Sequence, residues 1–535
     1  MAAGSDSDVN EERLIRFMSD PGIYGHRPKS VRLIQTHASL VFVASPFVFK
    51  IKKPVDFGFL DFSTLEKRRH FCDRELALNQ RLCPEGYLEV VPITLEDGDL
   101  RLDGKGMPVE YALRMKEFSE DGFFDRQVES GTATTGDLDR IVETLTNFYE
   151  AQHPTPEIGE WGSVEKLRIS TDENFAQTEA FVGKTITASA FAAIRLFTNQ
   201  FYETQAGLLA SRVAGGWIRD CHGDLHLEHI HLTAEHLYIY DCIEFNDRFR
   251  YVDVASDAAF LAMDLDFRGR RDLSRYFVGR LADRLKDGEM RRLMPFYQCY
   301  RAYVRGKVES LQCESPEVGE EDRKAAAERA ERYFRLSLEY AVSGASPLLI
   351  AVMGRVASGK STLAEGLGSE LGWEVFSSDR IRKELAGVPS TERVDDEARR
   401  RLYSPQMSER TYVRMREEAT AEALATGGAV MDATFSLSRG RRELREKAAS
   451  EEVETWFVWV EADQSRREKR LVQRESEEQV VSDARQEDRA TLDERFEEPG
   501  SGEEGVVRVE SDGESPTVAQ ALGSLAKCAA RNEGG

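Results

Sequence analysis

Residues 354–362 read Gly354-Arg355-Val356-Ala357-Ser358-Gly359-Lys360-Ser361-Thr362. This is the pattern G-x-x-x-x-G-K-S of a phosphate-binding loop, the Walker A motif, whose glycines let the backbone close around an anion. A continuous apolar run at 348–353 precedes it and predicts a buried parallel strand. After it, Leu363, Leu367 and Leu371 recur every four residues, as on the buried face of a helix. Strand, loop and helix in this order predict a P-loop α/β domain.

The loop predicts the ligand as well as the fold. Its N–H groups and the positive end of the following helix are expected to face phosphate oxygens. In this motif Lys360 reaches the β- and γ-phosphates of the nucleotide, and the Ser361 hydroxyl is a ligand of Mg²⁺. We therefore expect ATP and Mg²⁺ as cofactors, with the whole loop 354–362 as their binding site.

The last third of the chain alternates strand and helix patterns, which predicts a parallel sheet covered on both faces by helices. The expected strands are 348–353, 374–377, 428–432, 455–460 and 506–510. Ligands of such sheets bind at the carboxyl ends of the strands. Asp379 and Arg382 follow the second strand, and Asp432 ends the third. Asp379 is a candidate to orient or deprotonate an acceptor hydroxyl, or alternatively a helix N-cap, and Asp432 is a candidate carboxylate for Mg²⁺.

Arginines spaced by four follow the fourth expected strand. Arg466, Arg470 and Arg474 would share one face of a helix. Arginines on a mobile lid can neutralise a transferring phosphate, but the interleaved glutamates favour a salt-bridged helix equally. We predict Arg470 and Arg474 as nucleotide-contacting lid residues, with Arg485 as a further candidate.

The first two-thirds of the chain contain a second set of candidate residues. The strand-like run 47–52 places Lys50 and Lys52 on one face, and a helix expected from residue 63 carries Glu75. A strand lysine paired with a helix glutamate holds ATP phosphates in kinases. The pattern leaves open which of the two lysines contacts phosphate.

A loop between two expected strands forms the second chemical centre. Asp224 lies in this loop, and Asp241 ends the strand that follows it. Phosphoryl transfer needs one carboxylate as a base and another to hold Mg²⁺. Histidines stand at 222, 226, 229 and 231, so zinc must be considered. The strand–loop–strand setting and the glycine at 223 do not fit the helical H-E-x-x-H zinc motif, so phosphotransfer is the favoured interpretation.

The sequence His-Gly-Asp-Leu-His at 222–226, followed by the strand-ending Asp241, resembles the aminoglycoside phosphotransferase family, relatives of protein kinases. The stretches 241–250, 253–257 and 300–308 resemble a bacterial group of two-domain proteins that join such a kinase-like domain to a P-loop domain. The C-terminal part is similar to small P-loop kinases, including polynucleotide-kinase and zeta-toxin-like groups.

The resemblance implies roles for single residues. Asp224 would be the general base, Asp241 the principal magnesium ligand, and Lys50, paired with Glu75, a phosphate contact. His229 stands where the family expects an Asn that binds Mg²⁺, which prefers oxygen donors. The first domain is then either a second kinase site or a catalytically impaired module that regulates the P-loop domain. By the resemblance to small P-loop kinases, Asp379 and Arg382 would form the Asp-x-x-Arg pair that activates the acceptor hydroxyl.

Length and composition bound these hypotheses. The chain has 535 residues and a formal net charge of −23, which argues against general nucleic-acid or membrane-surface binding. The seven cysteines form no C-x-x-C pair, and neither a signal peptide nor a membrane-length apolar run is seen, so we expect a cytoplasmic protein.

The predicted architecture has two domains. We expect a bilobal α+β kinase-like domain at 1–342, a linker at 343–347 and a P-loop α/β sandwich at 348–535. The predicted function is ATP-dependent transfer of the γ-phosphate to a small hydroxyl-bearing acceptor, with two nucleotide sites. The alternatives are the regulated P-loop enzyme and a P-loop ATP hydrolase. The acceptor and the oligomeric state cannot be read from the sequence.

Overall fold

The computed structural model describes residues 10–315, 317–344, 346–389, 392, 394–475, 489–500, 502–511 and 517–531. Contacts divide the chain into two compact units. The first comprises Met1–Lys166 with Leu209–Gly288, and the second comprises Leu167–Leu208 with Glu289–Gly535. This division does not follow the predicted linker at 343–347, because helices from the first two-thirds of the chain belong to the same unit as the P-loop sheet. The domain boundaries 1–342 and 348–535 therefore stay a prediction.

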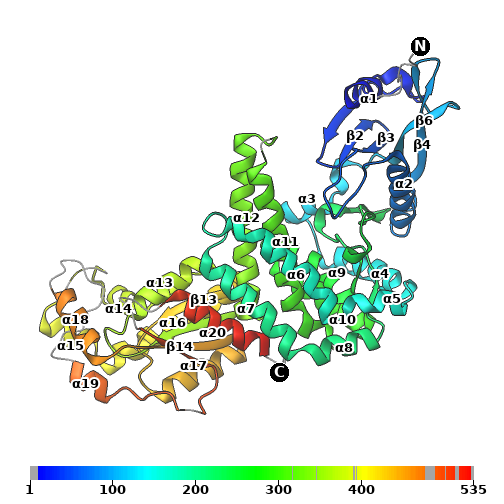
Figure 1. Cartoon of the computed structure of the whole chain (residues 1–535). Helices are drawn as coiled ribbons and strands as arrows, with labels where there is room; N and C mark the ends of the chain where they lie inside the picture. The colour runs from blue at the N-terminus through cyan, green and yellow to red at the C-terminus, as the bar shows by residue number, and fades with distance from the viewer. Residues whose placement is uncertain are drawn as a thin grey trace. The chain divides into compact units, whose positions relative to one another are not determined.

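The first unit is built on an antiparallel sheet of six strands in the order β1-β2-β3-β6-β4-β5. These are β1 (Arg32–Gln35), β2 (Ser39–Ala44), β3 (Phe47–Lys52), β4 (Tyr87–Glu96), β5 (Asp99–Leu102) and β6 (Met107–Lys116). Helix α2 (Leu65–Asn79) packs against β4 and β6, as Figure 1 shows in the blue part of the chain.

The alternation of β3 decides which residues reach the site. Phe49 and Ile51 are buried in a core to which helix α1 (Glu11–Met18) contributes Leu14 and Met18. Because neighbouring side chains of a strand point to opposite faces, Lys50 and Lys52 face the other way. They meet Glu75 on α2 there, as the sequence predicted.

The rest of the first unit is helical, with two short antiparallel strand pairs. The helices are α3 (Phe124–Glu129), α4 (Thr135–Ala151), α5 (Pro156–Gly159), α8 (Ala206–Ala214), α9 (Val254–Phe267) and α10 (Arg271–Leu285). The pairs are β7 (Ile218–Asp220) with β10 (Tyr251–Asp253), and β8 (Ile230–Leu232) with β9 (Leu237–Ile239). The loop 221–229 joins the two pairs. Arg212 is fully buried and anchors the region through ion pairs of 2.8 Å to Asp253 and 2.5 Å to Asp287.

The second unit contains a five-stranded parallel sheet in the order β12-β13-β11-β14-β15. The strands are β11 (Leu348–Met353), β12 (Val375–Ser377), β13 (Gly428–Asp432), β14 (Glu454–Glu461) and β15 (Val506–Glu510). All five lie where the sequence predicted them. Every residue of β11 is buried, which explains its continuous apolar sequence in the middle of the sheet.

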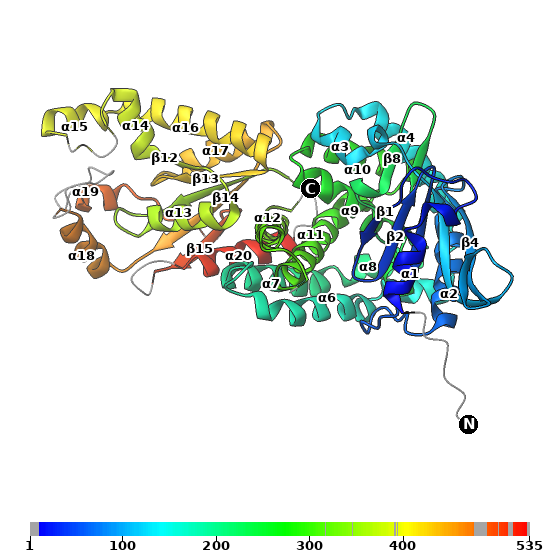
Figure 2. The ribbon, with the colours of Figure 1, turned by 90° about the horizontal axis from the view of Figure 1, so that it is seen from above.

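Helices cover both faces of this sheet. In Figure 2, α16 (Pro405–Thr426) and α17 (Ser438–Ser450) lie on one face, and α13 (Lys360–Leu371) and α20 (Val518–Arg531) on the other. The shorter helices are α14 (Ser378–Ala386), α15 (Asp396–Leu402), α18 (Gln464–Glu475) and α19 (Arg489–Glu494). The predicted class, a kinase-like α+β fold and a P-loop α/β sandwich, is confirmed.

Four further helices belong to the second unit. They are α6 (Val164–Thr178), α7 (Ala188–Thr204), α11 (Met290–Glu314) and α12 (Glu320–Ser343). Helices α11 and α12 pack along one another, and a Cβ at Gly306 would lie 2.9 Å from the Phe334 ring. Helix α7 packs on α20. Within the described ranges, no helix combines the length and apolar character needed to cross a membrane.

Candidate active sites

The phosphate loop of the second unit has the backbone that its sequence predicts. Gly354 has φ 146° and Gly359 has φ 103°, and Ala357 is left-handed with φ 61°. A Cβ at Gly354 would lie 2.5 Å from the carbonyl oxygen of Val460, so the loop closes tightly on β14. A left-handed alanine costs about 1–2 kcal/mol, and the surrounding contacts must hold it.

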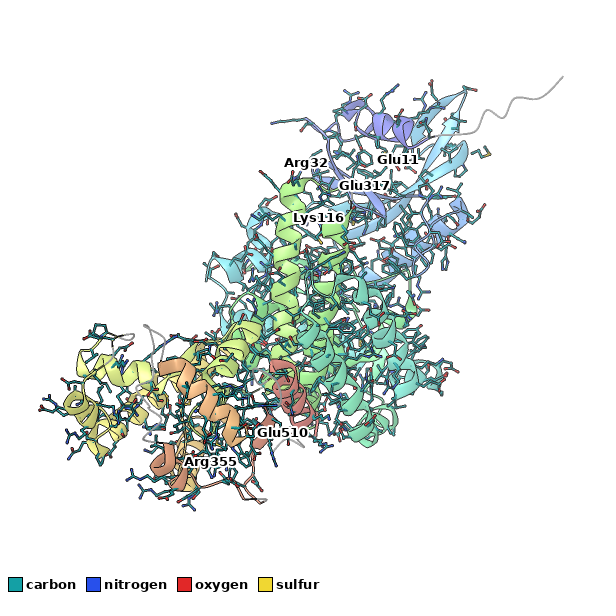
Figure 3. All side chains as sticks on the ribbon, turned by 60° about the vertical axis from the view of Figure 1, so that its left-hand side comes forward. Glu11, Arg32, Lys116, Glu317, Arg355 and Glu510 are labelled. Atoms are coloured by element: carbon teal, nitrogen blue, oxygen red, sulfur yellow. The ribbon has the colours of Figure 1, made fainter. Side chains whose placement is uncertain are left out.

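Arg470 is one of those contacts. Its Nη1 donates to the carbonyl oxygens of Ser358 at 2.8 Å and Ala357 at 3.3 Å, and its Nη2 donates to the Ser511 hydroxyl at 3.0 Å. Lys360 Nζ donates to the carbonyl of Arg355 at 3.0 Å. Arg355, labelled in Figure 3, pairs with Glu498 at 2.8 Å. Arg470 thus braces the phosphate loop, and its contact with nucleotide stays a prediction.

Two predicted Mg²⁺ ligands meet at the end of β13. The Ser361 hydroxyl hydrogen-bonds to the Asp432 carboxylate, which is almost fully buried. Burial raises the pKa of Asp432 above its ordinary value, and Lys360 lowers it only in part. A carboxylate beside a hydroxyl provides the oxygen donors that Mg²⁺ prefers, so these residues fit the ion.

Asp379 lies in the first turn of α14, and Ser377, not Asp379, is the N-cap residue. Arg382 Nη1 donates to Asp379 Oδ1 at 2.8 Å, and the Tyr403 hydroxyl donates to the same oxygen at 3.3 Å. The Arg382 guanidinium also lies 4.5 Å over the Tyr403 ring. The N-cap alternative is therefore wrong, and two neighbours fix the carboxylate in place.

One cavity of about 1300 Å³ joins these groups. Its lining includes the phosphate loop together with Asp379, Arg382 and Asp432. It also includes six basic residues that sequence reasoning missed: Arg399, Arg400, Arg416, Arg439, Lys447 and Arg495. They come from α15, α16, α17 and the segment after α19, and nothing in their local sequence distinguishes them from solvated surface charges. The side chain of Arg474 and the whole of Arg485 lie outside the described residues.

In the first unit, the two lysines of β3 have different partners. Lys50 Nζ contacts Glu75 at 2.8 Å and Asp241 at 3.0 Å. Lys52 Nζ contacts Glu75 at 2.6 Å and also pairs with Glu244. Only 1% of the Lys52 side chain is exposed, against 19% for Lys50. Lys50 therefore lies beside Asp241, the carboxylate predicted to hold metal. Lys52 is enclosed between the carboxylates of Glu75 and Glu244.

The charges of this cluster are set by burial and by each other. Burial alone would lower the pKa of both lysines, but the neighbouring carboxylates raise it well above the ordinary value. Burial would raise the pKa of Asp241, yet the Lys50 ammonium group holds it far below the usual range. The lysines and Asp241 are thus charged at neutral pH. Sequence reasoning missed the pairing role of Glu244.

The loop after β7 is held by a buried carboxylate. Asp257 accepts hydrogen bonds from the backbone N–H groups of His222 at 3.1 Å and Gly223 at 2.8 Å, and from the Tyr149 hydroxyl at 2.9 Å. His222 Nε2 donates to the Tyr240 carbonyl at 2.9 Å, and burial lowers the pKa of His222 to about 4. His222 is therefore a neutral brace of the loop.

Asp224 and His229 lie together beside Asp241. His229 Nδ1 donates to the Asp224 carbonyl at 2.9 Å, and its Nε2 lies 3.6 Å from Asp241 Oδ2. His226 Nε2 lies 3.5 Å from Asp224 Oδ2. Burial and the neighbouring His226 lower the pKa of His229. The predicted base, metal ligand and phosphate-binding lysine of the first unit are thus brought together.

Comparisons with known proteins find one matching family and several relatives. The AAA domain family profile matches residues 349–499. Uncharacterized proteins of Mycobacterium tuberculosis and Mycobacterium bovis are 33% identical over 351 residues, which is 66% of this chain and 68% of theirs. The chain belongs to the family of these mycobacterial proteins. The family match confirms the P-loop domain predicted at the carboxyl end.

Two solved structures are similar to parts of the chain. A gluconokinase from Sinorhizobium meliloti 1021 is 24% identical, with a TM-score of 0.24, covering 34% of this chain and 94% of its own. A choline kinase from Cryptosporidium parvum Iowa II is 10% identical, with a TM-score of 0.38, covering 62% of this chain and 95% of its own.

Proposed function

We propose that the second unit transfers the γ-phosphate of ATP to the hydroxyl of a small acceptor. The observation that carries the proposal is the shared cavity, in which Lys360, Asp379 and Asp432 line one space with the phosphate loop. Phosphoryl transfer needs these three functions close together: a cation on the phosphates, a carboxylate at the acceptor and a carboxylate for Mg²⁺.

Each residue has a task in this proposal. The loop amides and Lys360 bind the β- and γ-phosphates, and Lys360 exchanges its bond to the Arg355 carbonyl for a phosphate oxygen. Ser361 and Asp432 would hold Mg²⁺, which supplies positive charge to the transferring group. Asp379 accepts the hydroxyl proton, and the hydrogen bond from Arg382 orients that carboxylate.

The lining of the cavity favours an anionic acceptor. Nine basic residues line it, against six acidic ones, whereas the whole chain carries a net charge of −23. The acidic residues are Asp379, Glu409, Asp432, Glu443, Glu494 and Glu497. A concentration of positive charge in a concave site raises the local concentration of anions. We therefore infer an acceptor that carries a carboxylate or a phosphate as well as the hydroxyl.

The first unit supports a second nucleotide site. Lys50, paired with Glu75 and Asp241, is placed as a phosphate-binding lysine next to a metal carboxylate. The other candidate is that the first unit binds a ligand and regulates the second unit without catalysis. This candidate is considered because His229 stands where the family has an oxygen ligand for Mg²⁺.

Paired knockouts test the two sites. Lys360→Ala should abolish transfer of labelled phosphate from ATP to hydroxylated acids, sugars and nucleosides, and Asp224→Asn should spare it. If a protein with both changes keeps its transfer activity, the proposal is wrong. If native protein releases phosphate to water at the same rate with every acceptor, it is a hydrolase and not a kinase.

A further inference from the structure

Three side chains of the first unit, Asp224, His226 and Asp241, gather around His229. Asp224, His226 and His229 each offer a ligand atom, and these atoms lie within 4.8 Å of one another. Asp241 adds a carboxylate oxygen 3.6 Å from His229 Nε2. Two imidazoles and two carboxylates make a donor set with both nitrogen and oxygen, which differs from the all-oxygen set that Mg²⁺ prefers.

The hydrogen bonds fix the orientation of the His229 ring. A backbone carbonyl can only accept, so Nδ1, at 2.9 Å from the Asp224 carbonyl, carries a proton. In a neutral imidazole the other nitrogen, Nε2, then has a lone pair. That lone pair faces Asp241 Oδ2, which is itself an acceptor.

Two acceptors that face each other repel unless a cation or a hydrogen-bond donor lies between them. Lys50 does not serve here, because its ammonium group bonds the other oxygen of Asp241, Oδ1, at 3.0 Å. The Nε2–Oδ2 separation of 3.6 Å suits a shared ion. With metal–ligand bonds of about 2.1 Å, two donors at this separation subtend an angle of about 120° at the metal, which four- or five-coordinate geometry accepts.

We propose that the first unit binds a borderline divalent transition-metal ion, of the Zn²⁺ and Co²⁺ class, between His229 and Asp241. Asp224 and His226 supply the remaining protein ligands after small side-chain rotations. Imidazole nitrogen suits these ions, whereas Mg²⁺ takes oxygen and keeps its water. The site therefore selects against Mg²⁺, and it stands independently of the kinase proposed for the second unit.

A proton on His229 is the alternative explanation of its contact with Asp241. A doubly protonated His229 would form an ion pair with Asp241 across the same 3.6 Å, with no metal needed. The two accounts differ in one measurable property, because only the first gives the protein a metal-dependent signal.

The test uses full-length protein treated with a chelator and titrated with CoCl₂ without nucleotide. Bound Co²⁺ with imidazole ligands gives visible d–d absorption, which Mg²⁺ and protons cannot give. We expect these bands in native protein, displacement by Zn²⁺, and retention in excess Mg²⁺. His229→Asn should weaken Co²⁺ binding at least about tenfold. His236→Asn, an exposed histidine of the adjacent hairpin, is the matched control and should bind as native protein does.

Two further variants distinguish Co²⁺ bound at this site from Co²⁺ bound at other carboxylates. His226→Gln should weaken Co²⁺ binding in the same direction, so the conclusion does not rest on the folding of one variant. Lys360→Ala should leave the bands unchanged, because that residue belongs to the other unit. Absence of bands in native protein, bands that survive both histidine changes, or displacement by Mg²⁺ as readily as by Zn²⁺ would each overturn the proposal.

Discussion

Lys50 and Lys52 should respond differently to the same substitution. The Lys52 side chain is 1% exposed and pairs with Glu75 and Glu244, both buried. Lys52→Met keeps the volume but leaves Glu244 without its ammonium partner and Glu75 with only one. Removing one partner of a buried ion pair costs about 3–5 kcal/mol. For a body of this size that lowers the melting temperature by roughly 6–20 °C.

Lys50→Met should act on ligand binding instead. Glu75 keeps Lys52, and the Asp241 side chain is 41% exposed, so water can solvate it. We expect a loss of stability below about 2 kcal/mol, together with loss of nucleotide binding in the first unit.

The assay is thermal unfolding combined with hydrogen–deuterium exchange of peptides that cover β3, which locates the effect in the first unit. Lys53→Met is the control, because within the described part of the chain the side chain of this neighbouring lysine makes one long, exposed hydrogen bond, of 3.5 Å to Gln35. Equal melting temperatures for Lys50→Met and Lys52→Met would refute the assignment of one lysine to the ligand and the other to structure.

Three further outcomes are expected in the second unit. Gly354→Ala should lower ATP affinity at least about tenfold by calorimetry, because its Cβ would lie 2.5 Å from the Val460 carbonyl; native affinity would mean that the loop is not tightly held. Arg470→Ala should raise the KM for ATP in steady-state kinetics, whereas Lys469→Ala, an exposed neighbour, should not; equal KM values would remove Arg470 from the site. Burial raises the pKa of Asp432, so its ionisation costs stability as the pH rises through that pKa. Asp432→Asn should remove this pH-dependent loss of stability, and it should also remove the stabilisation by Mg²⁺–ATP. Thermal melts at several pH values measure both effects. If Mg²⁺–ATP stabilises the variant as much as native protein, Asp432 is not a carboxylate for Mg²⁺.

The parallel sheet could be predicted because its signals are local. Strand β11 is a continuous apolar run, and the glycines of 354–362 fix the loop between β11 and α13. The candidate residues at the strand ends then follow from topology alone, since parallel strands present their carboxyl ends at one edge.

Other features depend on contacts distant in sequence. The basic lining of the cavity brings together Arg399, Arg439 and Arg495, which are far apart in the chain. Glu244 acquires its role only when β3 lies beside the segment after β9. The grouping of α6, α7, α11 and α12 with the P-loop sheet reflects helix packing, for which the sequence around residue 345 gave no signal.

The local sequence around Asp379 could not decide between an N-cap and a residue inside the helix. Aspartate before a helical run is a normal N-cap, and only the observed start of α14 at Ser378 excludes it. The same limit applied to Lys50 and Lys52, because strand alternation puts both on one face and only their partners distinguish them.

Transfer from γ-labelled ATP is the decisive assay of phosphate transfer by the second unit. Native protein is mixed with labelled ATP, Mg²⁺ and a set of hydroxylated carboxylic acids and sugar phosphates, and labelled products are separated and counted. The account predicts a labelled acceptor with native protein and with Asp224→Asn, and none with Lys360→Ala or Asp379→Asn. A labelled acceptor that persists in Lys360→Ala and disappears in Asp224→Asn would place the chemistry in the first unit and contradict the account.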